Sequence, residues 1–144
     1  MDRLRDERGS TVLPMVVLTF LLLSAGGLGF DLYRLIVARQ TVVGIVDSAA
    51  IAGATAVDEQ EYFDSQGTVV VLDPAVARER AAASMSSQNA PLASASISVA
   101  PGGEEITVAG AVEMQFTLLR LLLPTLGTAR VQASATSAPR QALE

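Results

Sequence analysis

Two pairs of adjacent carboxylates, Asp58-Glu59 and Glu104-Glu105, come nearest to a constellation for general acid–base chemistry. Adjacent acids in polar stretches are normally solvated charge rather than a catalytic pair. The chain contains no Cys, no His and no Lys, so its Ser, Asp and Glu side chains lack the usual activating partners. We therefore expect no catalytic residues and a protein that is not an enzyme.

Binding of metals, cofactors or nucleic acid is not expected either. The acidic stretch 58–64 lacks the ligand, glycine and glutamate spacing of a calcium loop. The glycines of Gly26-Gly27-Leu28-Gly29 lie inside a hydrophobic segment, where they cannot cradle a phosphate. All ten basic residues are Arg, and they form no basic face interleaved with aromatics. We expect no cofactor, no metal, no small-molecule substrate and no nucleic-acid partner.

A segment without charge, GSTVLPMVVLTFLLLSAGGLGF, fills residues 9–30. Because a helix of ~20 apolar residues crosses a hydrocarbon core of about 30 Å, this segment predicts a single-pass transmembrane helix. Three Arg precede it, whereas only Arg34 and Arg39 follow closely. This slight excess predicts the N-terminus inside and the C-terminal part outside the cytoplasmic (inner) membrane. Two other interpretations compete with it. One is a cleaved secretory signal, with a small-x-small site at residues 24–27. The other is a buried helix of a soluble protein, which 144 residues of this composition could hardly surround.

The helix is expected to continue past the membrane, because apolar residues from Leu32 to Val46 recur at spacings of three and four. One helix over residues 13–57 would be about 65 Å long. The expected organisation is a short cytoplasmic head at 1–12, a transmembrane helix continuing as an exposed stalk at 13–57, and a small extracytoplasmic α+β domain at 58–144.

Small side chains dominate the end of this helix, DSAAIAGATAV from Asp47 to Val57. Residues four apart share a helix face, and small ones there let two backbones come close. The predicted helix-packing face consists of Ser48, Ala49, Ala52 and Gly53. Two partners fit such a face: the protein's own sheet, or another copy or related subunit in a helical bundle.

The remaining segments predict a pilin-like α+β fold with a short second helix and a sheet of about three strands. Residues 58–73 are expected to form a solvated loop, and Asp73-Pro74 to start a helix that ends near Gln88. One face of this helix carries Val76, Arg80 and Ala83, and it is only weakly apolar. Alternation of period two then predicts antiparallel strands at 93–99, 106–114 and 130–136.

A strongly apolar stretch, FTLLRLLLPTLG at residues 116–127, separates the last two expected strands and carries one charge. Exposed apolar patches of this kind mark interaction sites. Three roles stay open for it: capping the sheet, facing a partner subunit, or touching the membrane surface.

The order of the N-terminal motifs resembles a known family. A charged head ending in Arg8-Gly9-Ser10 leads into the apolar span, and DLYR, ARQ and DSAAIAGA follow. This order resembles the TadE/TadG-like proteins of tight-adherence (Flp) pilus assembly. The residues that carry the family motif are Asp31, Arg34, Arg39, Asp47, Ala50 and Ala54. The resemblance implies a membrane-anchored, pilin-like minor or accessory subunit of a pilus or related secretion apparatus, acting in cell adhesion through helix packing rather than catalysis.

The resemblance also implies partners: other pilin-like or pilus-assembly membrane proteins, further copies of this chain, and the lipid bilayer. Gly9 and Ser10 form a possible prepilin-peptidase junction. Family members cut at such a site carry a Glu five residues into the mature chain, whereas Pro14 stands there in this sequence. This departure favours an accessory subunit over a filament-forming pilin cleaved after Gly9. The other alternative is a membrane-tethered extracytoplasmic binding module.

Overall fold

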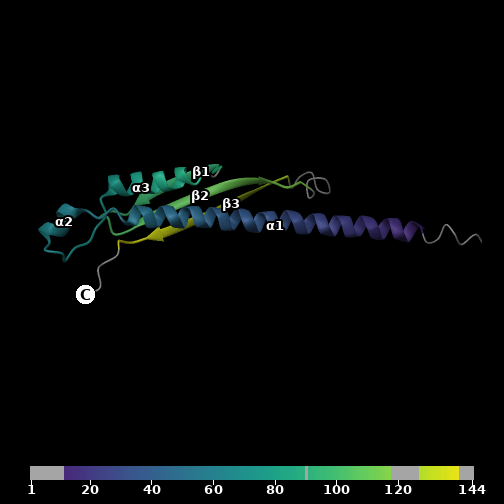
Figure 1. Ribbon diagram of the computed structural model, residues 1–144, viewed down its shortest axis with the longest axis horizontal. Coiled ribbons are helices and arrows are strands. Elements are labelled where there is room, and N and C mark those ends of the chain that lie inside the picture. Colours follow the sequence, from purple (N-terminus) through teal and green to yellow (C-terminus); the bar gives the residue numbers. More distant parts are fainter. Residues whose placement is uncertain (1–11, 90, 118–126, 140–144) are drawn as a thin grey trace, which may run out of the picture.

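The computed structural model describes residues 12–89, 91–117 and 127–139 of the chain. The elements follow in the order α1 (Val12–Ala54), α2 (Glu59–Asp64), α3 (Pro74–Ser87), β1 (Ser94–Val99), β2 (Ile106–Gln115) and β3 (Thr128–Ser137) (Figure 1). The predicted α+β class, with a long N-terminal helix, a short helix and an antiparallel three-stranded sheet, is confirmed.

The sheet has the order β1-β2-β3, and each strand pairs antiparallel with its neighbour. Ile97 lies opposite Val108, which lies opposite Ala135, and this apolar row faces the helices. The next row of paired residues lies on the other face of the sheet and consists of Ser96, Ala109 and Ser134. The alternation of apolar and small polar residues therefore makes one face of the sheet buried and leaves the other open.

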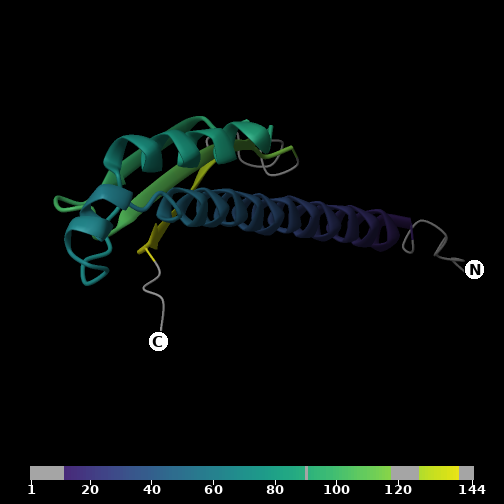
Figure 2. The ribbon, with the colours of Figure 1, turned by 60° about the vertical axis from the view of Figure 1, so that its left-hand side comes forward.

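Both long helices cover the same face of the sheet. α1 contacts β2, β3 and α3, and α3 also contacts β1. Figures 1 and 2 show that only the C-terminal half of α1 runs along the sheet, while its N-terminal half extends alone. From here on, the head means the part formed by α2, α3 and the sheet, and not the short N-terminal segment at residues 1–12. The core between these layers includes the fully buried Val42 and Val46 of α1, Leu72, and Ile106 and Val108 of β2.

Two glycines set how closely α1 approaches its neighbours. A Cβ added to Gly110 of β2 would lie 3.1 Å from Cγ1 of Val46, and one added to Gly53 would meet Ile106, Ala77 and Ala81. Ala77 and Ala81 of α3 are completely buried. The two helices thus meet through Gly and Ala, which allow the backbones to come close together.

Between Asp58 and Ser87 the structure differs from the sequence-based expectations in two places. The expected loop at 58–73 contains α2, because the carboxylate of Asp58 accepts hydrogen bonds from the amides of Gln60 and Glu61 and caps a short helix. The buried face of α3 consists of Ala77, Ala81 and Met85, and the weakly apolar face noted in the sequence, with Val76, Arg80 and Ala83, is a different one.

Arg80 has a different role at the exposed side of α3. Its guanidinium donates hydrogen bonds to the carbonyl and the hydroxyl of Thr55, at 2.9 and 3.0 Å. It therefore places a positive charge beside the C-terminus of α1, where the helix dipole is negative. α1 ends at Ala54, three residues before the predicted end, and Val57 then pairs with Leu72 in an isolated β-bridge.

Candidate functional site

The predicted helix-packing face is divided between the interior and the surface. Ala49 and Gly53 are buried against the protein's own α3 and β2. Ala52 is half-buried, while Ser48 is exposed and donates its hydroxyl to the carbonyl of Gly44 at 2.7 Å. Ala49 and Gly53 therefore pack closely against other parts of the same chain. Ser48 lies on the side of α1 that points away from α3 and the sheet.

The outward side of α1 beyond the charge-free span exposes large apolar side chains alongside polar ones such as Gln40 and Asp47. Its exposed large side chains past Phe30 are Leu32, Tyr33, Ile36, Val37, Val43 and Ile51. Ile51 is 62 % exposed, and a Cβ added to Gly44 would meet nothing within 4 Å. An apolar surface with a glycine in open space is suited to receive another helix, since a contiguous apolar patch marks an interaction site.

Two family-motif residues are brought to one point on the sheet. Asp31 is only 3 % exposed, and its carboxylate accepts a hydrogen bond from the amide of Thr117 at 3.3 Å. Arg34, one turn further along α1, donates to the hydroxyl of Thr117 at 3.1 Å. Asp31 and Arg34 thereby attach the end of β2 to the middle of α1.

The other motif residues do not join this cluster. Arg39 and Asp47 are exposed on α1, whereas Ala50 and Ala54 are buried in the core. Thr117 was missed by the sequence analysis, because a threonine inside an apolar stretch carries no pattern that points to a residue more than eighty positions away.

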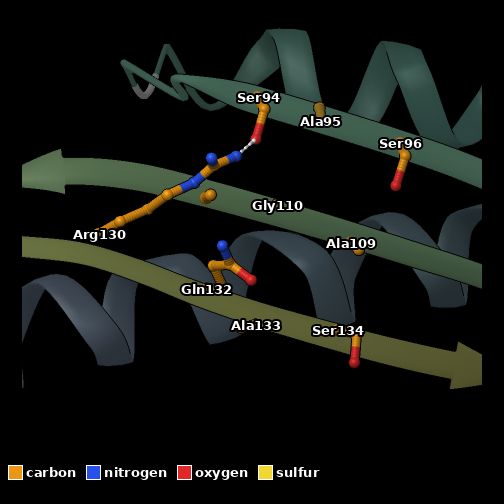
Figure 3. Close-up of a pocket in the computed structure, with 10 residues that line it drawn as sticks. Ser94, Ala95, Ser96, Ala109, Gly110, Arg130, Gln132, Ala133 and Ser134 are labelled. Atoms are coloured by element: carbon orange, nitrogen blue, oxygen red, sulfur yellow. Dashed lines mark hydrogen bonds between the residues drawn. The ribbon is translucent and has the colours of Figure 1, made fainter.

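The open face of the sheet holds a shallow depression of about 340 Å³ (Figure 3). Its lining residues are Ser94, Ala95, Ser96, Ala109, Gly110, Ala111, Arg130, Gln132, Ala133 and Ser134. Arg130 crosses from β3 to donate a hydrogen bond of 2.8 Å to the hydroxyl of Ser94 on β1. No carboxylate is among these lining residues, although Glu113 lies opposite Arg130 in the pairing of β2 with β3.

Two acids of the head cap helices. Asp73 caps α3 by accepting from the amides of Ala75 and Val76, as Asp58 does for α2. Within the described ranges, no three metal-binding side chains gather at one place. The predicted junction at Gly9 and Ser10, and residues 118–126 of the apolar stretch, lie outside the described residues.

Comparison with known proteins points to α1. Residues 9–56 match the family model described as "Putative Flp pilus-assembly TadE/G-like". Over this third of its length, the chain is TadE/TadG-like. The matched residues contain the charge-free span, Asp31 and Arg34, and the small-residue stretch except for Val57. No curated protein and no solved structure matches the chain.

The TadE/TadG-like match and the structure agree on the character of α1. The helix is long and apolar enough to cross a membrane, and few residues of its most apolar window are buried in the chain. The match supports an involvement in Flp pilus assembly, in which such proteins are structural rather than catalytic components.

Proposed function

We propose that this TadE/TadG-like protein is a membrane-anchored, pilin-like accessory subunit for the assembly of a tight-adherence pilus or a related secretion apparatus. In this proposal residues 1–12 lie in the cytoplasm, the first half of α1 crosses the cytoplasmic membrane, and residues 58–144 lie outside. The family match over residues 9–56 and the apolar N-terminal half of α1 support this arrangement.

The observation that carries the proposal is the two-sided character of α1 beyond Phe30. One side is buried by α3 and the sheet, and the other exposes apolar side chains together with Gly44 and Ser48. A stalk that served only as a tether would gain nothing from an apolar outer side. The proposed mechanism is that the anchor diffuses in the membrane until this outer side packs against helices of partner subunits, which include other pilus-assembly proteins or further copies of this chain.

Bulky substitutions on the outer side of α1 test this mechanism. Gly44→Leu and Ser48→Leu should leave the head folded, because a Cβ at Gly44 meets open space and Ser48 is exposed. Gly44→Leu should even stabilise the helix by up to about 1 kcal/mol. We expect normal amounts of protein in the membrane but a strong loss of surface pili, counted by electron microscopy in cells whose own copy of the gene is deleted.

The matched control is Ala83→Leu, which places the same side chain on the exposed side of α3. It should leave the number of pili unchanged. Normal piliation in both α1 variants would show that partner helices do not pack on this side, and the proposed mechanism would then be wrong.

Cleavage after Gly9 separates the accessory subunit from the alternative of a filament-forming pilin. Because Pro14 stands where a cleaved pilin would carry its Glu, we expect the intact mass of the protein from native membranes to be that of the full chain. A mass lacking residues 1–9 would instead support the filament-forming pilin. A soluble form lacking about the first 27 residues would contradict the membrane anchor itself, since a secretory signal would then precede a secreted domain.

A further inference from the structure

The level of the outer membrane surface along α1 is marked by its own residues. Residues 12–30 carry no charge and span about 28 Å as a helix, close to the ~30 Å of a hydrocarbon core. Phe30 and Tyr33 are exposed, at 57 % and 64 %, and Asp31 and Arg34 are the first charges. Aromatic residues and the first charges gather at membrane–water interfaces. If α1 spans the membrane as proposed, the outer surface lies at residues 30–34.

The end of the β2–β3 hairpin is attached at this same level. The hydrogen bonds from Thr117 to Asp31 and from Arg34 to Thr117 join the hairpin to α1. The amide of Phe116 donates to the carbonyl of Gly127 at 3.1 Å, so both ends of the connection between the strands start from this point. The head therefore does not stand clear of the membrane on a stalk but reaches down to the boundary of the span.

The side of α1 that carries Asp31 stays covered below this level. Gly27 lies one turn earlier on the same face and is buried, and Ser24 is half-buried. Gly26 and Gly29, which lie on other faces, are open to the outside. The buried side of α1 thus extends from Asp31 to Gly27, in the charge-free part of the helix.

From these observations we infer that the hairpin end at Phe116 and Thr117 is a lipid-contacting surface, which rests the head on the outer leaflet of the bilayer. The inference depends on the proposed membrane anchor. Phe116 and Thr117 are held at the level of Phe30 and Tyr33 by the hydrogen bonds of Thr117 to Asp31 and Arg34. An aromatic ring at the interface of a bilayer is removed from water, as the ring of Phe116 would be at this level.

Single tryptophans can measure this depth, because the chain contains no Trp and its four Phe lie at different levels. Four variants of the full chain are reconstituted in phosphatidylcholine vesicles: Phe20→Trp in the span, Phe30→Trp at its boundary, Phe116→Trp at the hairpin end, and Phe63→Trp in α2. Phe63 is 73 % exposed and is the aqueous control, because it belongs to α2, which lies at the opposite end of the head (Figure 1). The readout is the loss of fluorescence caused by lipids brominated near the top or near the end of their acyl chains, and by iodide in the water.

The Phe116→Trp variant is expected to lose as much fluorescence as the Phe30→Trp variant to the lipids brominated near the headgroup. Its emission should lie to the blue of that from the Phe63→Trp control. A hairpin tryptophan that behaves like this control, quenched by iodide and untouched by bromine, would overturn the inference. So would a hairpin tryptophan shielded from both quenchers, because protein rather than lipid would then cover the hairpin end.

The Phe20→Trp variant allows the lipid contact of the hairpin end to be tested separately from the proposed membrane anchor. Strong quenching of the Phe20→Trp variant by the deeply brominated lipid, together with an unquenched Phe116→Trp variant, would leave the anchor intact and reject only the lipid contact. Absence of quenching in the Phe20→Trp variant would reject the membrane-spanning helix and, with it, the inference that depends on it.

Discussion

Replacing Gly53 with valine is expected to lower the free energy of unfolding of the head substantially. A Cβ at this position would collide with the side chain of Ile106 and lie 3.0 Å from the carbonyl oxygen of Ala77 and 3.4 Å from Cβ of Ala81. Two of these contacts belong to α3 and one to β2, so α1 would have to move away from both. Overpacking of a core costs about 1–3 kcal/mol or more, while replacing a helical glycine gains less than about 1 kcal/mol. Small domains are stable by only about 5–15 kcal/mol, so the loss is a substantial fraction.

The measurement is urea-induced unfolding of the full chain in detergent micelles, followed by circular dichroism. Gly44→Val is the matched control, because it makes the same substitution in the same helix at a position where an added Cβ meets nothing within 4 Å. This control should unfold at the same or a slightly higher urea concentration than the unsubstituted protein. Equal midpoints for the Gly53 and Gly44 variants would contradict the close contact of α1 with α3 and β2.

The second large effect is expected for Gly103→Ala in the turn between β1 and β2. Gly103 has a φ of +71°, and a Cβ there would lie 2.5 Å from the carbonyl oxygen and 2.9 Å from the amide nitrogen of Leu72. The backbone at Leu72 cannot retreat easily, because its amide donates to the carbonyl of Gly103 at 2.8 Å and its side chain is buried in the core. Left-handed strain and disturbance of this hydrogen bond together predict a loss of about 3 kcal/mol in the free energy of unfolding.

Gly102→Ala separates the strain from the collision. Gly102 also has a positive φ, +94°, but the nearest atom to an added Cβ is Cγ of Glu104 at 4.0 Å. Its substitution should cost only the strain, about 1–2 kcal/mol. If chemical unfolding shows the same loss for both alanine variants, the contact between the turn and Leu72 does not contribute to stability.

The sequence alone was sufficient wherever a local pattern reports local structure. The charge-free run ending at Phe30 indicated the helix that becomes α1, and Asp73-Pro74 marked the start of α3. Alternation of apolar and small polar residues located β1, β2 and β3 to within a few residues. The family-motif order at residues 8–54 was sufficient for the resemblance that the match over residues 9–56 supports.

The patterns of small residues on α1 and α3 did not reveal which side of each helix would be buried against the rest of the chain. Ser48 and Ala49 are adjacent and similar in size, yet one is exposed and the other is completely buried. On α3, alanines and serines surround most of the helix, so no strong apolar stripe distinguished the face of Ala77 and Ala81 from that of Val76. When every side of a helix is weakly apolar, the partner surface selects the buried side, and that surface belongs to another part of the chain.

The sequence by itself determined the order of the elements along the chain. This order is an apolar helix that continues beyond the charge-free span, a capped shorter helix, and three strands with alternating apolar and polar residues. Only the tertiary structure decided that the sheet lies back along α1, so that Thr117 meets Asp31 and Arg34. The physical reason is that helices and strands follow from residue periodicity within a few turns. A hydrogen bond between residues 31 and 117, by contrast, depends on the packing of Gly53, Ile106 and Ala77, which sets the position of the whole sheet on the helix.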